Sequence, residues 1–155
     1  MTAPLVDPEW LAEAWVGLCE VLAAALPDDL HYADDYDASP TPAGKATVVR
    51  GPLVASLERC VGVTYYDIEQ TEPMLGLIEA FYQVRVRLGV SGLEALRLTG
   101  KIRAALHEQS AIALGRARAS LILAGNLADV GPDENGRPQY TVNFRVRSDG
   151  ALSTA

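Results

Sequence analysis

The sequence predicts an α+β domain in which a mostly antiparallel sheet of four to five strands carries two long helices on one face. Two segments place apolar residues at three- and four-residue spacing, which is typical of amphipathic helices. Other segments alternate apolar and polar residues, as strands with one buried face do. Because the order helix, strands, helix, strands has no regular β-α-β repeat, a doubly wound fold is disfavoured.

The length and composition suit a single domain. The chain has 155 residues, of which 49% are hydrophobic and 21% are charged, as in an ordinary globular protein. We assign residues 1–148 to one domain and residues 149–155 to a disordered C-terminal tail. No apolar stretch approaches the roughly 20 residues that cross a bilayer, so we expect no membrane association. Cys19 and Cys60 are expected to be buried, reduced thiols.

A first helix is predicted over residues 7–25. Asp7 can cap its N-terminus, and Pro8 suits the first helical position, where its missing N–H costs nothing. Pro27 ends the helix. The apolar face is formed by Leu11, Ala14, Trp15, Leu18, Leu22 and Ala25.

The middle of the chain predicts three strands of unequal length. Residues 27–44 are rich in Pro and Asp and indicate a loop that contains one short strand, at residues 30–32. A second short strand is expected at residues 46–50. A longer one is expected at residues 61–69, where β-branched and aromatic residues gather. Residues 71–80 include a Glu-Pro step and indicate a loop or a short helical turn.

The clearest strand, residues 81–88, precedes a second helix. Its apolar face consists of Tyr82, Val84, Val86 and Leu88, and its other face of Phe81, Gln83, Arg85 and Arg87. Ser91 then caps the helix, because Glu94 three residues later completes a capping box. His107 lies near the end of this helix.

The C-terminal third predicts two more strands. Residues 112–124 are interpreted as one strand with a kink at Gly115. Asn135 and Gly136 indicate a turn, because both residue types tolerate a positive φ. In the strand that follows, Tyr140, Val142, Phe144 and Val146 form one face, and Thr141, Asn143, Arg145 and Arg147 form the other.

Charge is unevenly distributed along the chain. Residues 1–37 hold nine of the 20 acidic residues and none of the 13 Lys and Arg residues. With a net charge of −7, the chain is a poor candidate for general nucleic-acid binding. Four arginines share a polar sheet face if their two strands share a sheet, and they are Arg85, Arg87, Arg145 and Arg147. Arg favours interfaces with carboxylates; a nucleic-acid patch and a merely solvated face are the alternatives.

Catalytic motifs are absent from the sequence. It contains no Walker, dinucleotide-binding, G-x-S-x-G or H-E-x-x-H pattern. Clustered carboxylates with a histidine can hold a divalent cation or act as acid and base. One such cluster comprises Asp28, Asp29, His31, Asp34, Asp35 and Asp37. Its spacing matches no motif, so we favour a solvated acidic loop over a metal-dependent hydrolase, and we expect no enzyme activity and no cofactor.

Three segments together resemble a known family. Residues 82–88 carry the strand QVRVR, residues 93–107 carry a helix with an Ala/Leu face, and residues 131–146 carry DENGRPQYTVNFRV. They resemble the tail-terminator (tail-completion or minor capsid) proteins of long-tailed bacteriophages. The N-terminal helix and the chain length also agree with this family, whereas residues 52–80 do not align with its pattern.

The resemblance implies an architectural role. Such proteins form a ring, typically hexameric, at the head-proximal end of the tail tube, where the ring ends tube polymerisation and joins tail to head. The implied partners are copies of the chain itself, the major tail tube protein and head–tail connector proteins, within a virion assembled in the host cytoplasm. DNA can pass through such a ring without specific binding. A head–tail connector or neck protein is the closest alternative.

The resemblance also implies roles for particular residues. A structural or inter-subunit turn is implied for Asp133, Asn135, Gly136 and Arg137. A ring joins two unlike faces of each subunit head to tail. The acidic side of this interface is expected to include Asp34, Asp35 and Asp37. The basic side is expected to include Arg85, Arg87, Arg145 and Arg147, and charge reversal of the first two should abolish assembly and leave the monomer folded.

Overall fold

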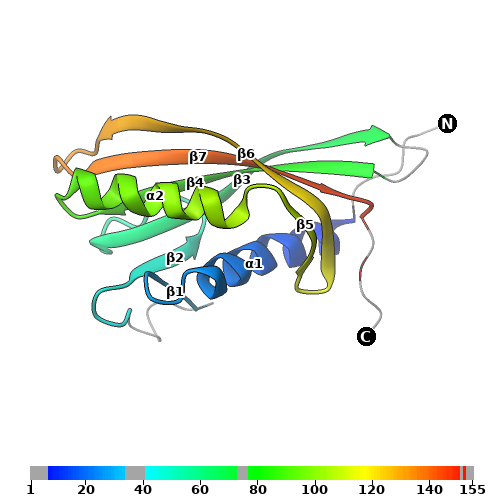
Figure 1. Cartoon of the computed structure of the whole chain (residues 1–155), viewed down its shortest axis with the longest axis horizontal. Helices are drawn as coiled ribbons and strands as arrows, with labels where there is room; N and C mark the ends of the chain where they lie inside the picture. Colours follow the sequence, from blue (N-terminus) through cyan, green and yellow to red (C-terminus); the bar gives the residue numbers. More distant parts are fainter. Residues whose placement is uncertain (1–6, 34–40, 73–76, 151, 153–155) are drawn as a thin grey trace.

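A computed structural model describes residues 7–33, 41–72, 77–150 and 152. They form an α+β fold in which one seven-stranded mixed sheet packs against two helices (Figure 1). The helices are α1 (Pro8–Ala25) and α2 (Gly92–Leu106). The strands are β1 (Leu30–Tyr32), β2 (Ala46–Arg50), β3 (Arg59–Glu72), β4 (Leu77–Leu88), β5 (Gln109–Leu114), β6 (Ala117–Pro132) and β7 (Pro138–Ser148).

The sheet is larger than predicted. Its strand order is β1-β2-β3-β4-β7-β6-β5, so the expectation of four to five strands is wrong. Neighbours from β3 to β5 pair antiparallel, as expected, but β1 pairs parallel to β2 and β2 pairs parallel to β3. The α+β class and the two helices are confirmed. Both parallel pairs involve strands of three or five residues, whose direction leaves no trace in hydrophobic periodicity.

The first helix begins as its sequence indicates. The Asp7 carboxylate accepts a hydrogen bond from the Glu9 amide at 2.8 Å, and Pro8 occupies the first helical position. The buried face is rotated from the predicted one: Trp10 and Gly17 are buried, whereas Ala25 is exposed. The reason is close backbone packing, since a Cβ at Gly17 would lie 2.2 Å from the Leu114 carbonyl carbon.

The second helix has the predicted capping box. The Ser91 hydroxyl accepts a hydrogen bond from the Glu94 amide at 3.2 Å. At the other end, Nδ1 of His107 accepts a hydrogen bond from the Ala124 amide at 3.0 Å. Arg103 donates from Nε to the Gly125 carbonyl at 2.8 Å, so the last turn of α2 satisfies two groups of β6.

Two predicted connections are wrong. Residues 112–124 form a hairpin of β5 and β6, not one strand, because Gly115 has φ 62° and reverses the chain. Residues 71–80 are mostly strand, since β3 continues to Glu72 and β4 begins at Leu77, with those two residues paired. The hairpin was missed because the apolar pattern continues on both sides of Gly115.

The core lies between the helices and one face of the sheet. One buried cluster joins Trp10, Leu18 and Leu22 of α1 with Ile102 of α2 and the predicted apolar faces of β4 and β7. The thiols of Cys19 and Cys60 are buried and not disulfide-bonded, as expected. No helix within the described ranges has the length and apolar character to cross a membrane. Leu152, in the predicted C-terminal tail, forms an isolated bridge with Ala117.

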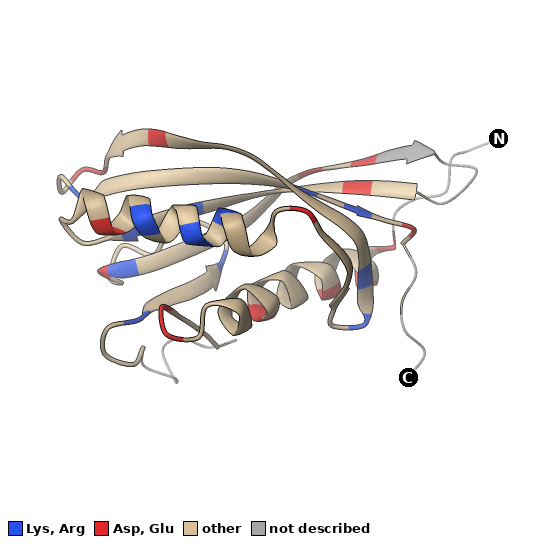
Figure 2. Cartoon of the chain, in the orientation of Figure 1, with Lys and Arg blue, Asp and Glu red and all other residues tan. Residues whose placement is uncertain are grey.

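The two helices carry opposite charge (Figure 2). Residues 7–33, which comprise α1 and β1, include six acidic residues and no Lys or Arg. The second helix carries Arg97, Lys101 and Arg103 against the single acidic residue Glu94. One subunit therefore presents an acidic and a basic helix side by side on the covered face of its sheet.

The contact at Gly17 predicts the effect of a single methyl group. Gly17→Ala should lower the free energy of unfolding by about 1–3 kcal/mol, because the added Cβ has no space against the Leu114 backbone. Urea denaturation monitored by circular dichroism measures the change. Gly100→Ala in α2 is the control: nothing lies within 4 Å of its Cβ, so it should stabilise by about 0.5–1 kcal/mol. Equal effects of the two substitutions would contradict the packing described.

Candidate interaction groove

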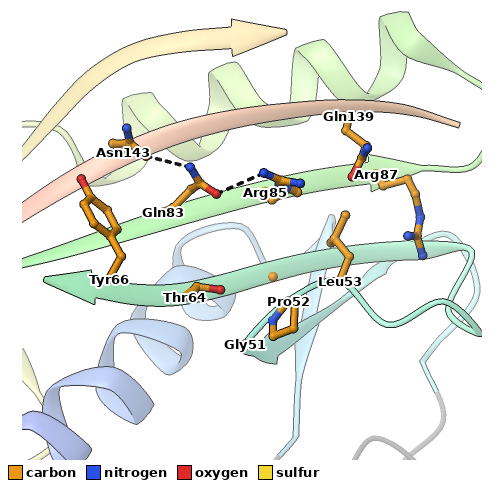
Figure 3. Close-up of a pocket in the computed structure, with 11 residues that line it drawn as sticks. Gly51, Pro52, Leu53, Thr64, Tyr66, Gln83, Arg85, Arg87, Gln139 and Asn143 are labelled. Carbon is orange, nitrogen blue, oxygen red and sulfur yellow. Dashed lines mark hydrogen bonds between the residues drawn. The ribbon is translucent and has the colours of Figure 1, made fainter. Parts of the chain in front are cut away.

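The uncovered face of the sheet is polar at its centre. Gln83 on β4 pairs with Thr64 on β3 and Asn143 on β7, so the three side chains rise on the same side. Nε2 of Gln83 donates to Oδ1 of Asn143, and Nη2 of Arg85 donates to Oε1 of Gln83, both at 3.4 Å (Figure 3). Both distances exceed those of strong hydrogen bonds, so the amide of Gln83 and the guanidinium of Arg85 can also donate to a ligand.

A groove of about 540 Å³ opens above this row. One wall is the strap, which we define as residues 51–58, between β2 and β3. The strap approaches β3 closely: the Gly51 amide donates to the Val63 carbonyl at 2.8 Å, and a Cβ on Gly62 would lie 2.6 Å from the Gly51 oxygen. The groove is lined by Gly51, Pro52, Leu53, Gly62, Thr64, Tyr66, Gln83, Arg85, Arg87, Gln139 and Asn143.

Arg87 holds the strap in place. Its residue is 3% exposed, and Nη2 donates to the carbonyls of Val54, at 2.8 Å, and Leu57. Its Nη1 lies 3.7 Å from the Asp133 carboxylate. A charge reversal here would leave buried carbonyls facing a carboxylate, so the expectation that an Arg85 and Arg87 double reversal leaves the monomer folded does not fit this site. Arg87 therefore serves the structure of the strap and is not a free contact residue.

The predicted turn between β6 and β7 supports the same strap. Oδ1 of Asp133 accepts from the amides of Asn135 and Arg137, each at 2.9 Å, and Gly136 has φ 74°. The buried Arg137 donates from Nε to Oδ2 of Asp133 at 2.7 Å and from Nη1 to the Ala55 carbonyl at 3.4 Å. The turn was predicted, but its contact with the strap left no local signal in the sequence.

The other three predicted arginines share the uncovered face but differ in partners. Arg147 forms an ion pair with Glu79 at 2.8 Å, and the Glu79 side chain is only 7% exposed. Arg145 is exposed on β7 and lines a smaller hollow of about 210 Å³. In the described part of the chain, neither Arg85 nor Arg145 has a carboxylate within ion-pair distance. These two cations are therefore the ones free to meet an external anion.

The predicted acidic cluster is described only in part. Asp34, Asp35 and Asp37 lie outside the described residues. Asp29 forms an ion pair with Lys101 of α2 at 3.3 Å. Among the residues that the structure describes, no group of three His, Cys, Asp or Glu side chains is arranged to hold a metal ion. The groove itself is lined by guanidinium groups, side-chain amides and a tyrosine.

Hydrogen bonding sets the ionisation of Asp133. Partial burial alone would raise the pKa of its carboxyl, but the hydrogen bonds and charge of Arg137, together with the Asn135 amide, outweigh burial and lower the pKa below the ordinary 3.8. A carboxyl whose pKa is depressed in the folded state stabilises that state above the unfolded pKa. This contribution disappears as the pH falls through the lower, folded pKa.

The strap contacts predict an acid-dependent stability. Asp133→Asn should lower the free energy of unfolding above about pH 5, and the difference from wild type should vanish as the pH falls below 3.8 through the folded pKa. Urea denaturation from pH 2 to 7 measures this difference. Glu134→Gln removes the same charge from the exposed neighbour and is the control for the change in net charge. A constant difference for Asp133→Asn would mean that its charge does not hold the turn.

Comparison with known proteins leaves the family of this chain open. No protein-family model matches it, and no curated protein matches its sequence. The function proposed next is therefore supported by the groove, by the charge distribution and by the resemblance of three sequence segments.

Proposed function

We propose that the chain is a ring-forming assembly protein of the tail-terminator type. One observation carries the proposal: each subunit bears two unlike surfaces, an arginine-bearing groove on the uncovered sheet face and an acid-rich N-terminal part. Unlike surfaces on one subunit are what a head-to-tail interface requires, and such interfaces close into rings when the rotation permits.

The basic surface consists of cations that have no carboxylate partner among the described residues. Arg85 and Arg145 stand on neighbouring strands of one face, and the lining of both hollows beside them includes no carboxylate. Two cations on one concave face attract an acidic partner and orient it before contact. Because Arg147 is already neutralised by Glu79, it adds little to this attraction.

The acidic surface is supplied by the first part of the chain. Glu20 of α1 and Asp28 in the turn after it are exposed, whereas Glu9 and Glu13 are paired with Arg116. Further along the sequence, the stretch after β1 contains three more acidic residues, Asp34, Asp35 and Asp37. An acidic patch and a basic groove on one subunit favour association of identical copies in one orientation.

In this proposal the ring, of six copies as the resemblance suggests, sits on the head-proximal end of a phage tail tube within the virion. It ends polymerisation of the tube protein and offers its other side to the head connector. The protein makes and breaks no covalent bond in this role. A connector ring on the portal side would use the same self-association but would not bind tail tubes.

Charge reversal on the uncovered face tests the proposal. Arg85→Glu with Arg145→Glu should abolish ring formation and leave tail tubes uncapped, because both free cations become anions. Negative-stain electron microscopy of tubes assembled with and without the protein measures capping and tube length. Wild-type protein should give capped tubes of fixed length.

The control places a single charge reversal of the same kind on the covered side of the sheet. Arg97→Glu alters an exposed arginine of α2, and its assembly should resemble that of wild type. Circular dichroism checks that all variants are folded. Full assembly of the double variant, or tubes of unregulated length in the presence of wild-type protein, would rule out the proposed role.

A further inference from the structure

The two hollows on the uncovered face adjoin each other, and we call them together the trough. The 540 Å³ groove beside the strap and the 210 Å³ hollow that reaches Leu123 of β6 are both lined by Tyr66 and Asn143. Tyr66 is 53% exposed, and its ring lies 6.0 Å from that of Phe81, centroid to centroid. The trough therefore presents an exposed aromatic pair together with two cations.

The distance between Arg85 and Arg145 determines how long a ligand must be to contact both. Arg145 pairs with Phe81, which lies four residues from Arg85 on β4, so the two arginines stand about 13 Å apart along the strands. An extended segment of four residues spans about 10 Å between its end Cα atoms, and the arginine side chains cover the difference. The amides of Gln83, Gln139 and Asn143 also line the trough and can bind peptide groups of such a segment.

We propose that this trough binds the segment Asp34-Asp35-Tyr36-Asp37 of a second copy of the chain, an inference that rests on the self-association proposed above. The segment has carboxylates on either side of one aromatic residue, which complements two cations and an exposed aromatic pair. No Lys or Arg occurs in residues 1–37 to oppose the attraction.

The backbone of the same copy's segment does not extend as far as Arg145. Ala33 lies beside Val49, in the hollow lined by Pro52 and Leu53, and the chain returns at Thr41 against the far end of the strap. A residue midway between them lies at most about 14 Å from either end. Arg145 stands four strands from β1 and four residues further along, about 23 Å from Ala33. At full extension the backbone of this segment ends about 9 Å short of Arg145, so contact with both arginines favours a second copy.

A complementation experiment tests the pairing. One variant carries Asp34→Asn, Asp35→Asn and Asp37→Asn and keeps its trough; the other carries Arg85→Glu and Arg145→Glu and keeps its segment. Each alone should be monomeric in sedimentation analysis. Their equimolar mixture should form heterodimers and nothing larger, because each pair can build only one interface. Assembly of the triple variant like wild type would overturn the inference.

A peptide assay tests the site even if the isolated chain is monomeric. A fluorescent peptide of residues 32–40, YADDYDASP, should bind wild-type protein saturably, and binding should weaken at least tenfold in the Arg85→Glu, Arg145→Glu variant but not in Arg97→Glu. Replacement of the three Asp by Asn in the peptide should weaken binding as much. Equal binding of that Asn peptide, or tighter binding of a single-stranded oligonucleotide, would overturn the inference.

The two proposals fail separately. If tube capping depends on Arg85 and Arg145 but not on the three aspartates, the ring function stands. The proposal that the aspartate segment occupies the trough is then wrong. Specific peptide binding by a protein that never caps tail tubes would retain self-recognition through the trough and remove the tail-terminator role.

Discussion

The structure of the uncovered face depends on one shared carboxylate. Asp133 accepts from Arg137 and lies beside Arg87, and the two arginines together donate to three carbonyl groups of the strap. A buried guanidinium without such partners would be costly, and so would the strap carbonyls without donors. The strap can form one wall of the groove because Asp133, in the turn between β6 and β7, supplies a negative charge. This charge offsets the cost of burying Arg87 and Arg137.

The two faces of the sheet differ in chemistry. On its covered face, apolar side chains of β4 and β7 meet both helices, and this cluster supplies the hydrophobic free energy of folding. On the other face, the same strands present Arg85, Gln83 and Asn143, which lie outside the buried cluster. Since side chains alternate along a strand, one register fixes both faces, and a slip by one residue would destroy both.

Local patterns predicted the elements whose causes are local. Asp7 with Pro8, and Ser91 with Glu94, fixed the helix starts, and alternation in residues 81–88 assigned Arg85 to the uncovered face. The hairpin at Gly115 was missed because apolar residues continue through it, and the parallel edge strands because pattern carries no direction. The burial of Arg87 was not predictable either, because its partner Val54 is 33 residues away in sequence. The alternation of apolar and polar residues in β4 does not indicate that the strap covers part of the polar face.

The first helix is also tied to a distant part of the chain. Arg116 in the β5–β6 hairpin donates to Glu13, 103 residues earlier, and Gly17 packs against Leu114. During synthesis at about 5–20 residues per second, α1 leaves the ribosome on the order of 5 to 20 seconds before that hairpin exists. Throughout this interval α1 can pack against β1 and β2 but not against the hairpin. The side of α1 that carries Gly17 therefore stays open to chaperones and to premature association until the hairpin emerges.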